Sequence, residues 1–187
     1  NEHTQNQIIL REIDHLIPGE FDTTIAVQDR DRIYNLGLFS TFEISQIDSI
    51  YTVFVVETFQ LLPIPIVEYK EGKGFSYGAR VTYLNFRGLN EQITIGGIGG
   101  EEATYFFNFI DPWIYGDHGS IITKIYQYYS ESAIYNYSYQ RRAFLIGSGV
   151  YMGEYHKFNS IIGYEIITLN TTSTQPKEYV KKTYFDG

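Results

Sequence analysis

The alternation of apolar and polar residues in the second half of the chain limits its fold more than any other feature. In the segment 75–84 the odd positions hold Phe, Tyr, Ala, Val and Tyr, while the even positions from 76 to 82 hold Ser, Gly, Arg and Thr. A period of two predicts a strand with one apolar face and one polar face. Noisier alternation recurs at 93–98, 105–109, 122–128, 139–150 and 158–169. The longer segments have 10 to 12 residues, which suits strands tilted through a hydrocarbon layer.

Composition narrows the choice of environment and partner. The 187 residues include 18 Tyr and 13 Phe, but no apolar run approaches the roughly 18 residues of a transmembrane helix. A chain of this kind can span a bilayer only as a closed barrel of strands. The net charge of -8 disfavours nucleic acid, because phosphate binding needs clustered Lys and Arg. The absence of Cys excludes disulfides and thiolate chemistry.

The first 58 residues follow a different pattern. Apolar residues at helical spacing predict a helix over 4–14 with Thr4 as its N-cap, and Pro18-Gly19 breaks it. A second helix is expected to begin at Asp22 or Thr23 and to end at Leu36, before Gly37. Two strands follow at 39–45 and 51–57. The order helix, helix, strand, strand predicts a small α+β domain with little core of its own.

The predicted connections between strands differ in length. Short, turn-rich connections are expected at 85–90, 112–119 and 152–157, and longer polar ones at 130–138 and 170–182. Outer-membrane barrels have short turns on the periplasmic side and longer external loops.

The chain begins without Met and ends in KKTYFDG without a closing element. We therefore interpret it as an internal fragment of a longer protein.

Several motifs, in their order along the chain, resemble one family. TQNQIILREI, a Pro-Gly break, DRIYNLGLFSTFEI and VVE resemble the last periplasmic POTRA repeat of the BamA/TamA outer-membrane assembly family. YGARVTYLNFRGLNEQ, FNFIDPW and RRAFLIGSGVYMGEYHKFNSIIGYE resemble the opening strands of the bacterial surface antigen barrel of that family. The resemblance implies a periplasmic β-α-α-β-β POTRA domain at 1–58, without its first strand, and the first antiparallel strands of an all-β transmembrane barrel at 59–187. The family's VRGF-type motif belongs to later strands and is absent here.

The function that the resemblance implies is insertion of other proteins into the bacterial outer membrane, without catalysis or cofactor. Unfolded outer-membrane client proteins would add strands to exposed edges, so that main-chain hydrogen bonds supply the affinity. Outer-membrane lipid and accessory assembly lipoproteins would be further partners. Two strand edges are expected to pair with client strands. The second edge contains prolines, which lack a backbone N–H and so remove hydrogen-bond donors where the first and last barrel strands would meet. The first edge is Thr41, Phe42, Glu43, Ile44 and Ser45, and the second is the seam strand Leu62, Pro63, Ile64, Pro65 and Ile66.

Several of these motifs also fit simpler interpretations. The prolines also fit a rigid linker, and Arg80 on the polar face fits a satisfied lumen charge. The Gly cluster 96–100 precedes a strand, so close strand packing explains it better than a nucleotide loop. Four scattered His residues give no metal-ligand spacing, and Ser148 lacks a strand-to-helix elbow. Two alternative functions stay open: a two-partner-secretion export pore of the same architecture, and a soluble β-rich surface or binding protein.

Overall fold

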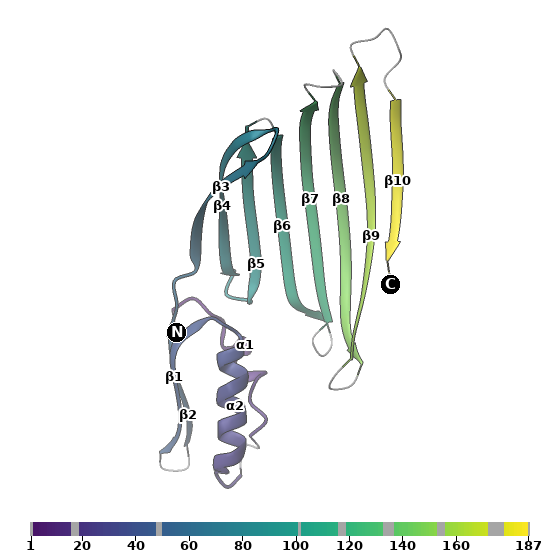
Figure 1. Cartoon of the computed structure of the whole chain (residues 1–187). Helices are drawn as coiled ribbons and strands as arrows, with labels where there is room; N and C mark the ends of the chain where they lie inside the picture. Colours follow the sequence, from purple (N-terminus) through teal and green to yellow (C-terminus); the bar gives the residue numbers. More distant parts are fainter. Residues whose placement is uncertain are drawn as a thin grey trace. The chain divides into compact units, whose positions relative to one another are not determined.

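The chain is divided into two compact units in the computed structural model (Figure 1). One unit comprises Asn1–Gln60 and Leu84–Glu91, and the other comprises Leu61–Tyr83 and Gln92–Gly187. In the described part of the chain, no helix has the length and apolar character needed to cross a membrane. The structure describes residues 2–15, 19–47, 50–100, 102–115, 119–132, 137–152, 156–171 and 178–186.

In its described residues, the first unit contains two helices and a hairpin. The elements are α1 (Asn6–Leu10), α2 (Thr23–Asn35), β1 (Phe39–Ile47) and β2 (Ile50–Glu57). The start of α2 follows the prediction, because the Asp22 carboxylate accepts the N–H groups of Thr24 at 2.7 Å and Ile25 at 3.4 Å. Gly37 follows the helix with a φ of 68°, which glycine adopts without strain. The expected N-cap of α1 is wrong. Gln5 occupies the N-cap position, and its side chain makes no capping hydrogen bond.

The core of the first unit is a small apolar cluster between the helices and the hairpin. Antiparallel pairing places Phe42 opposite Val55 and Ile44 opposite Val53, so these four side chains face the helices. Leu89, from the connection between two strands of the other unit, packs against the same cluster. The buried members are Ile8, Ile9, Ile33, Leu38 and Phe39.

The described residues of the second unit form one antiparallel sheet of eight strands (Figure 1). Each strand pairs with its neighbours in the sequence, so the chain runs up and down across the sheet from β3 to β10. In the described chain, β3 and β10 are the two outer strands. The strands are β3 (Leu61–Lys70), β4 (Gly74–Phe86), β5 (Glu91–Gly99), β6 (Glu102–Tyr115), β7 (Gly119–Ser132), β8 (Tyr137–Met152), β9 (His156–Thr171) and β10 (Glu178–Asp186).

Two expectations about the connections are corrected. The segment 170–182 was expected to be a loop, but β10 begins at Glu178 and pairs with β9 residue by residue. Cross-strand hydrogen bonds stabilise a strand whose own alternation is weak. The expected turn at 112–119 is also wrong, because β6 continues to Tyr115. Its register shifts between Asp111 and Tyr115, around Pro112, which has no N–H for the ladder.

Glycines allow β4 and β5 to approach closely. A Cβ added to Gly78 would lie 2.1 Å from the carbonyl oxygen of Gly97. At this separation any side chain at position 78 would push the two strands apart. In the predicted Gly cluster, an added Cβ would meet the Phe106 ring at 2.3 Å from Gly96 and the Tyr105 ring at 2.9 Å from Gly97, so close packing accounts for these two glycines. Gly99 has open space around it, and close packing does not account for it. Near the same end of the sheet, the Glu102 carboxylate accepts hydrogen bonds from Lys70 at 2.5 Å, from Tyr128 at 2.6 Å and from Lys73. This carboxylate therefore ties the tip of the β3–β4 hairpin to β6 and β7.

Candidate functional site

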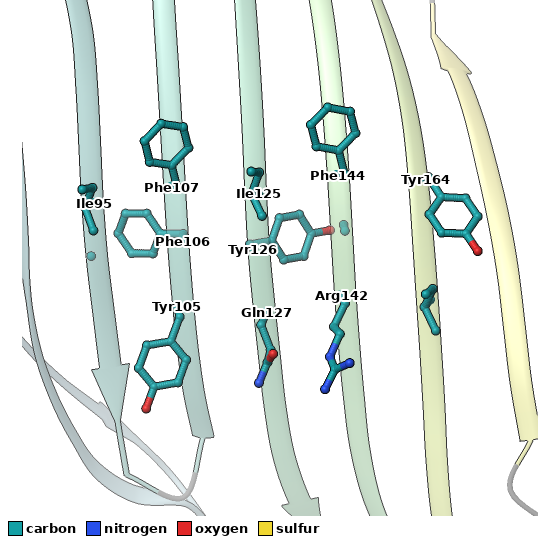
Figure 2. Close-up of a pocket in the computed structure, with 13 residues that line it drawn as sticks. Ile95, Tyr105, Phe106, Phe107, Ile125, Tyr126, Gln127, Arg142, Phe144 and Tyr164 are labelled. Atoms are coloured by element: carbon teal, nitrogen blue, oxygen red, sulfur yellow. The ribbon is translucent and has the colours of Figure 1, made fainter. Parts of the chain in front are cut away.

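One face of the second unit is apolar and exposed. The strand registers align Ile95, Phe107, Ile125, Phe144 and Tyr164 in one row across β5 to β9 (Figure 2). The exposed fractions of Ile95, Ile125 and Phe144 are 58%, 46% and 46%, which is high for side chains of their size. We call the side of the sheet that carries this row the apolar face.

The apolar face extends over the strands on both sides of this row. A soluble monomer seldom exposes contiguous apolar patches above a few hundred Å². A face of this kind therefore requires cover, either by lipid or by protein. Further exposed side chains on the apolar face, placed by the registers, are Val67, Tyr69, Phe75, Tyr77, Val81, Tyr105, Ile146, Phe158 and Ile162.

The opposite face of the sheet carries paired polar groups. Glu165 is only 1% exposed and forms an ion pair with Arg141, whose Nη2 donates to Oε2 at 3.2 Å. The Arg141 guanidinium also lies 5.4 Å from the centre of the Tyr126 ring. Thr82 and Thr94 share a hydroxyl–hydroxyl bond of 3.1 Å between β4 and β5. Arg80 lies two residues from Thr82 and therefore shares this polar face.

The outer edge of β3 lacks two backbone donors. Leu84 N donates to Gln60 O at 2.8 Å, which makes Gln60 and Leu84 a hydrogen-bonded pair at the start of the ladder. Because pairing alternates along an antiparallel ladder, the even residues of β3 bond to β4 and the odd residues point to the open edge. Pro63 and Pro65 are odd residues. On the open edge, N–H groups therefore remain only at Leu61, Val67 and Tyr69.

The first predicted edge, Thr41 to Ser45, lies in β1. One side of this strand pairs with β2, and among the described residues no strand pairs with the other side. The side chains divide between two environments: Phe42 and Ile44 pack against the core, whereas Thr41, Glu43 and Ser45 are exposed. A substitution at Ile44 would therefore disturb the core as well as the edge.

A network that sequence reasoning missed joins the N-terminal segment to the connection 85–90. The Gly88 carbonyl accepts the N–H of Gln5 at 2.9 Å, and the Asn85 amide donates to the Thr4 hydroxyl at 2.8 Å. A Cβ at Gly88 would meet the His3 carbonyl oxygen at 2.3 Å. Asn85, like Arg87 and Asn90, has a positive φ. Two Asn residues and a Gly within six positions are the sequence signal for such a turn, but its partner 80 residues away leaves no local trace.

Glu57 completes this network. Its carboxylate accepts the N–H groups of Thr4 at 2.6 Å and His3 at 3.1 Å. Partial burial raises the pKa of Glu57, but the hydrogen bonds from Thr4 and then His3 outweigh it and hold that pKa below its ordinary value of 4.5. The charged carboxylate thus fastens the N-terminal segment to the end of β2.

Asp29 is a second buried carboxylate of the first unit, and its role is structural. It is fully buried and accepts the Tyr51 hydroxyl at 3.0 Å, the N–H of Asp14 at 2.9 Å and the guanidinium of Arg32. Burial, and then the hydrogen bond to Asp29, raise the pKa of Tyr51. Every partner of this carboxylate belongs to the same small unit, so the cluster connects α2 to β2 and to the preceding loop.

Metal-ligating side chains are not grouped in the described ranges. There, no three His, Cys, Asp or Glu side chains are arranged to hold a metal ion. Ser148 lies on β8 and shares a bond of 2.8 Å with the Tyr115 hydroxyl rather than with a base. The exposed apolar face and the open edge of β3 form the candidate site.

An up-and-down antiparallel sheet of long strands with an exposed apolar face is the architecture of outer-membrane barrels. Neither a protein-family model nor a curated protein matches the chain. Among solved structures, BamA from Haemophilus ducreyi lacking POTRA domains 1–3 is similar, with a TM-score of 0.77 and 16% sequence identity. The match covers 98% of this chain and 40% of that chain, so this chain spans about two fifths of its length. The fold is that of part of BamA.

Proposed function

We propose that the protein assembles other β-barrel proteins in a bacterial outer membrane. The observation that carries the proposal is the BamA-like backbone over 98% of the chain, whose sheet exposes an apolar face. In this proposal, residues 59–187 are the first strands of the barrel, and lipid covers the apolar face. Residues 1–58 are a POTRA-like domain in the periplasm. The likeness to BamA supports the fold, and the edge geometry supports the mechanism.

The proposed mechanism is addition of a client strand to the open edge of β3. The edge offers N–H donors at Leu61, Val67 and Tyr69 and carbonyl acceptors at every odd residue. Because Pro63 and Pro65 contribute no donor, the middle of the edge binds any strand weakly. A client strand would pair first near Val67 and Tyr69, and the weak pairing at the prolines would allow it to dissociate. The edge Thr41 to Ser45 of β1 would hold client strands in the same way before insertion.

Site-specific photo-crosslinking in the full-length protein tests this mechanism. A benzophenone amino acid at Tyr69 would stand on the edge strand, and the same group at Ile125 would stand on the same face of β7, which pairs on both sides. During assembly of an unfolded barrel client, we expect an adduct with the client from position 69 and none from position 125. Equal yields at both positions, or efficient assembly without an adduct at 69, would contradict edge pairing.

A further inference from the structure

The position of Arg142 on the apolar face is unusual. Its neighbour Arg141 points to the polar face and pairs with Glu165, but Arg142 lies on the exposed apolar face between Gln127 and Ile166. Among the residues that the structure describes, the Arg142 guanidinium has no hydrogen-bond or ion-pair partner. A charge on a lipid-covered face is costly unless an interfacial group solvates it. We infer that Arg142 binds the phosphate of an anionic membrane lipid, an inference that rests on the proposed function.

Two polar side chains accompany Arg142. The registers place Tyr105 opposite Gln127 and Gln127 opposite Arg142, so the three form one row across β6, β7 and β8. Figure 2 shows the Tyr105 hydroxyl, the Gln127 amide and the Arg142 guanidinium directed the same way, away from the row of Phe107, Ile125 and Phe144. Hydroxyl, amide and guanidinium groups all donate hydrogen bonds, and a phosphate accepts them.

The same side chains border an apolar hollow. Ile95, Phe107, Ile125, Phe144 and Tyr164 line the hollow together with Tyr105, Gln127 and Arg142 (Figure 2). On the apolar face, one row of the lining is apolar, and the next row holds Tyr105, Gln127 and Arg142 beside the apolar Ile166. This order matches a lipid whose acyl chain lies along the apolar row and whose phosphate meets the polar row.

The level of the polar row along the strands supports a lipid headgroup. Beyond Arg142, toward the start of β8, the apolar face becomes polar at Gln140 and Ser138, and on β7 at Glu131. In the other direction lie Phe144 and Ile146. Arg142 therefore lies at the boundary between the apolar and the polar rows of this face. In membrane proteins, aromatic and long basic side chains are typical of such a boundary, because it lies at the level of the lipid headgroups. Arg rather than Lys suits this position, because its planar fork can bond two phosphate oxygens.

Native mass spectrometry of the full-length protein in dodecyl maltoside tests the assignment. The probes are phosphatidylglycerol, a neutral galactosyl diacylglycerol of equal chain length, and inorganic phosphate. We expect Arg142→Gln to weaken retention of phosphatidylglycerol about tenfold, which is the size of effect expected from the loss of one charge-assisted hydrogen bond. Retention of the neutral lipid should not change. Arg142→Lys should retain an intermediate share. Arg80→Gln is the matched control, because it makes the same change on the opposite face.

Each other outcome has a distinct meaning. Equal retention of phosphatidylglycerol by the wild type and Arg142→Gln would overturn the lipid site, as would an equal loss in Arg80→Gln. Displacement of the lipid by inorganic phosphate at similar concentrations would show a general anion site and would also overturn it. Failure of the proposed membrane function is distinguishable from both, because the wild type would then retain neither the anionic nor the neutral lipid.

Discussion

Restoring the missing donors on β3 should make client release slow. The double variant Pro63→Ala with Pro65→Ala adds two N–H groups to the open edge of β3, where the strand already offers its carbonyl groups. Each new hydrogen bond contributes about 0.5–1.5 kcal/mol net, so two contribute about 1–3 kcal/mol. At roughly 1.4 kcal/mol per factor of ten, the paired state gains about 5-fold to 150-fold. Loss of proline rigidity in the unpaired strand offsets part of this gain.

The assay is the lifetime of the client complex in proteoliposomes containing the full-length protein, followed by crosslinking at Tyr69. We expect the complex of the double variant to persist several-fold longer, by the gain in pairing less the loss of proline rigidity, and the yield of finished client to fall. Ile64→Ala is the control, since it removes side-chain atoms from the same strand without changing a donor. A double variant that is folded, as judged by circular dichroism, but has a wild-type lifetime would refute the role of the donor gap.

The remaining predictions concern topology and the first unit. In intact cells, a thiol reagent added from outside should label Ser132→Cys but not Arg87→Cys, which is an exposed site beside the buried Gly88. Labelling of Arg87→Cys but not Ser132→Cys would show that the proposed membrane sidedness is wrong. Asp29→Ala should destabilise the first unit by about 3 kcal/mol, because it leaves its buried partners unpaired, whereas exposed Asp31→Ala should change the denaturation midpoint little. Because Glu57 has a lowered pKa in the folded state, its contribution is complete above the ordinary value of 4.5 and is lost as pH falls through the lowered pKa. Thermal denaturation against pH should show this loss, and Glu57→Gln should remove that part of the pH dependence.

Local patterns predicted much of the fold. The second helix was predicted from an Asp N-cap and a terminal Gly, and both signals act within a few residues of the helix. The strands were predicted where one face is apolar, since alternation reports burial or lipid contact directly. The hairpin of the first unit was also anticipated, and β1 and β2 extend beyond the predicted bounds.

Long-range contacts account for what the sequence did not show. Thr4 has the chemistry of an N-cap, but its hydroxyl accepts a hydrogen bond from Asn85, which lies 81 positions away. The strand β10 alternates weakly and depends on pairing with β9. The row of Tyr105, Gln127 and Arg142 depends on the registers of three strands, and no local pattern specifies a register. The ladder between β3 and β4 determines which N–H groups of β3 face its open edge, and no local sequence pattern shows this.

The connection 84–91 has a consequence for the order of folding. Leu89 packs in the core of the first unit, and Gly88 bonds to Gln5, so this unit includes a segment that is synthesised after the strands β3 and β4. Closing so long a loop costs entropy and slows folding. The first 60 residues should therefore remain incompletely packed until the turn between β4 and β5 has formed. Complete packing of the first unit would then depend on prior formation of β3 and β4. A substitution that disrupts the turn between β4 and β5 would impair the folding of the first unit as well as the sheet.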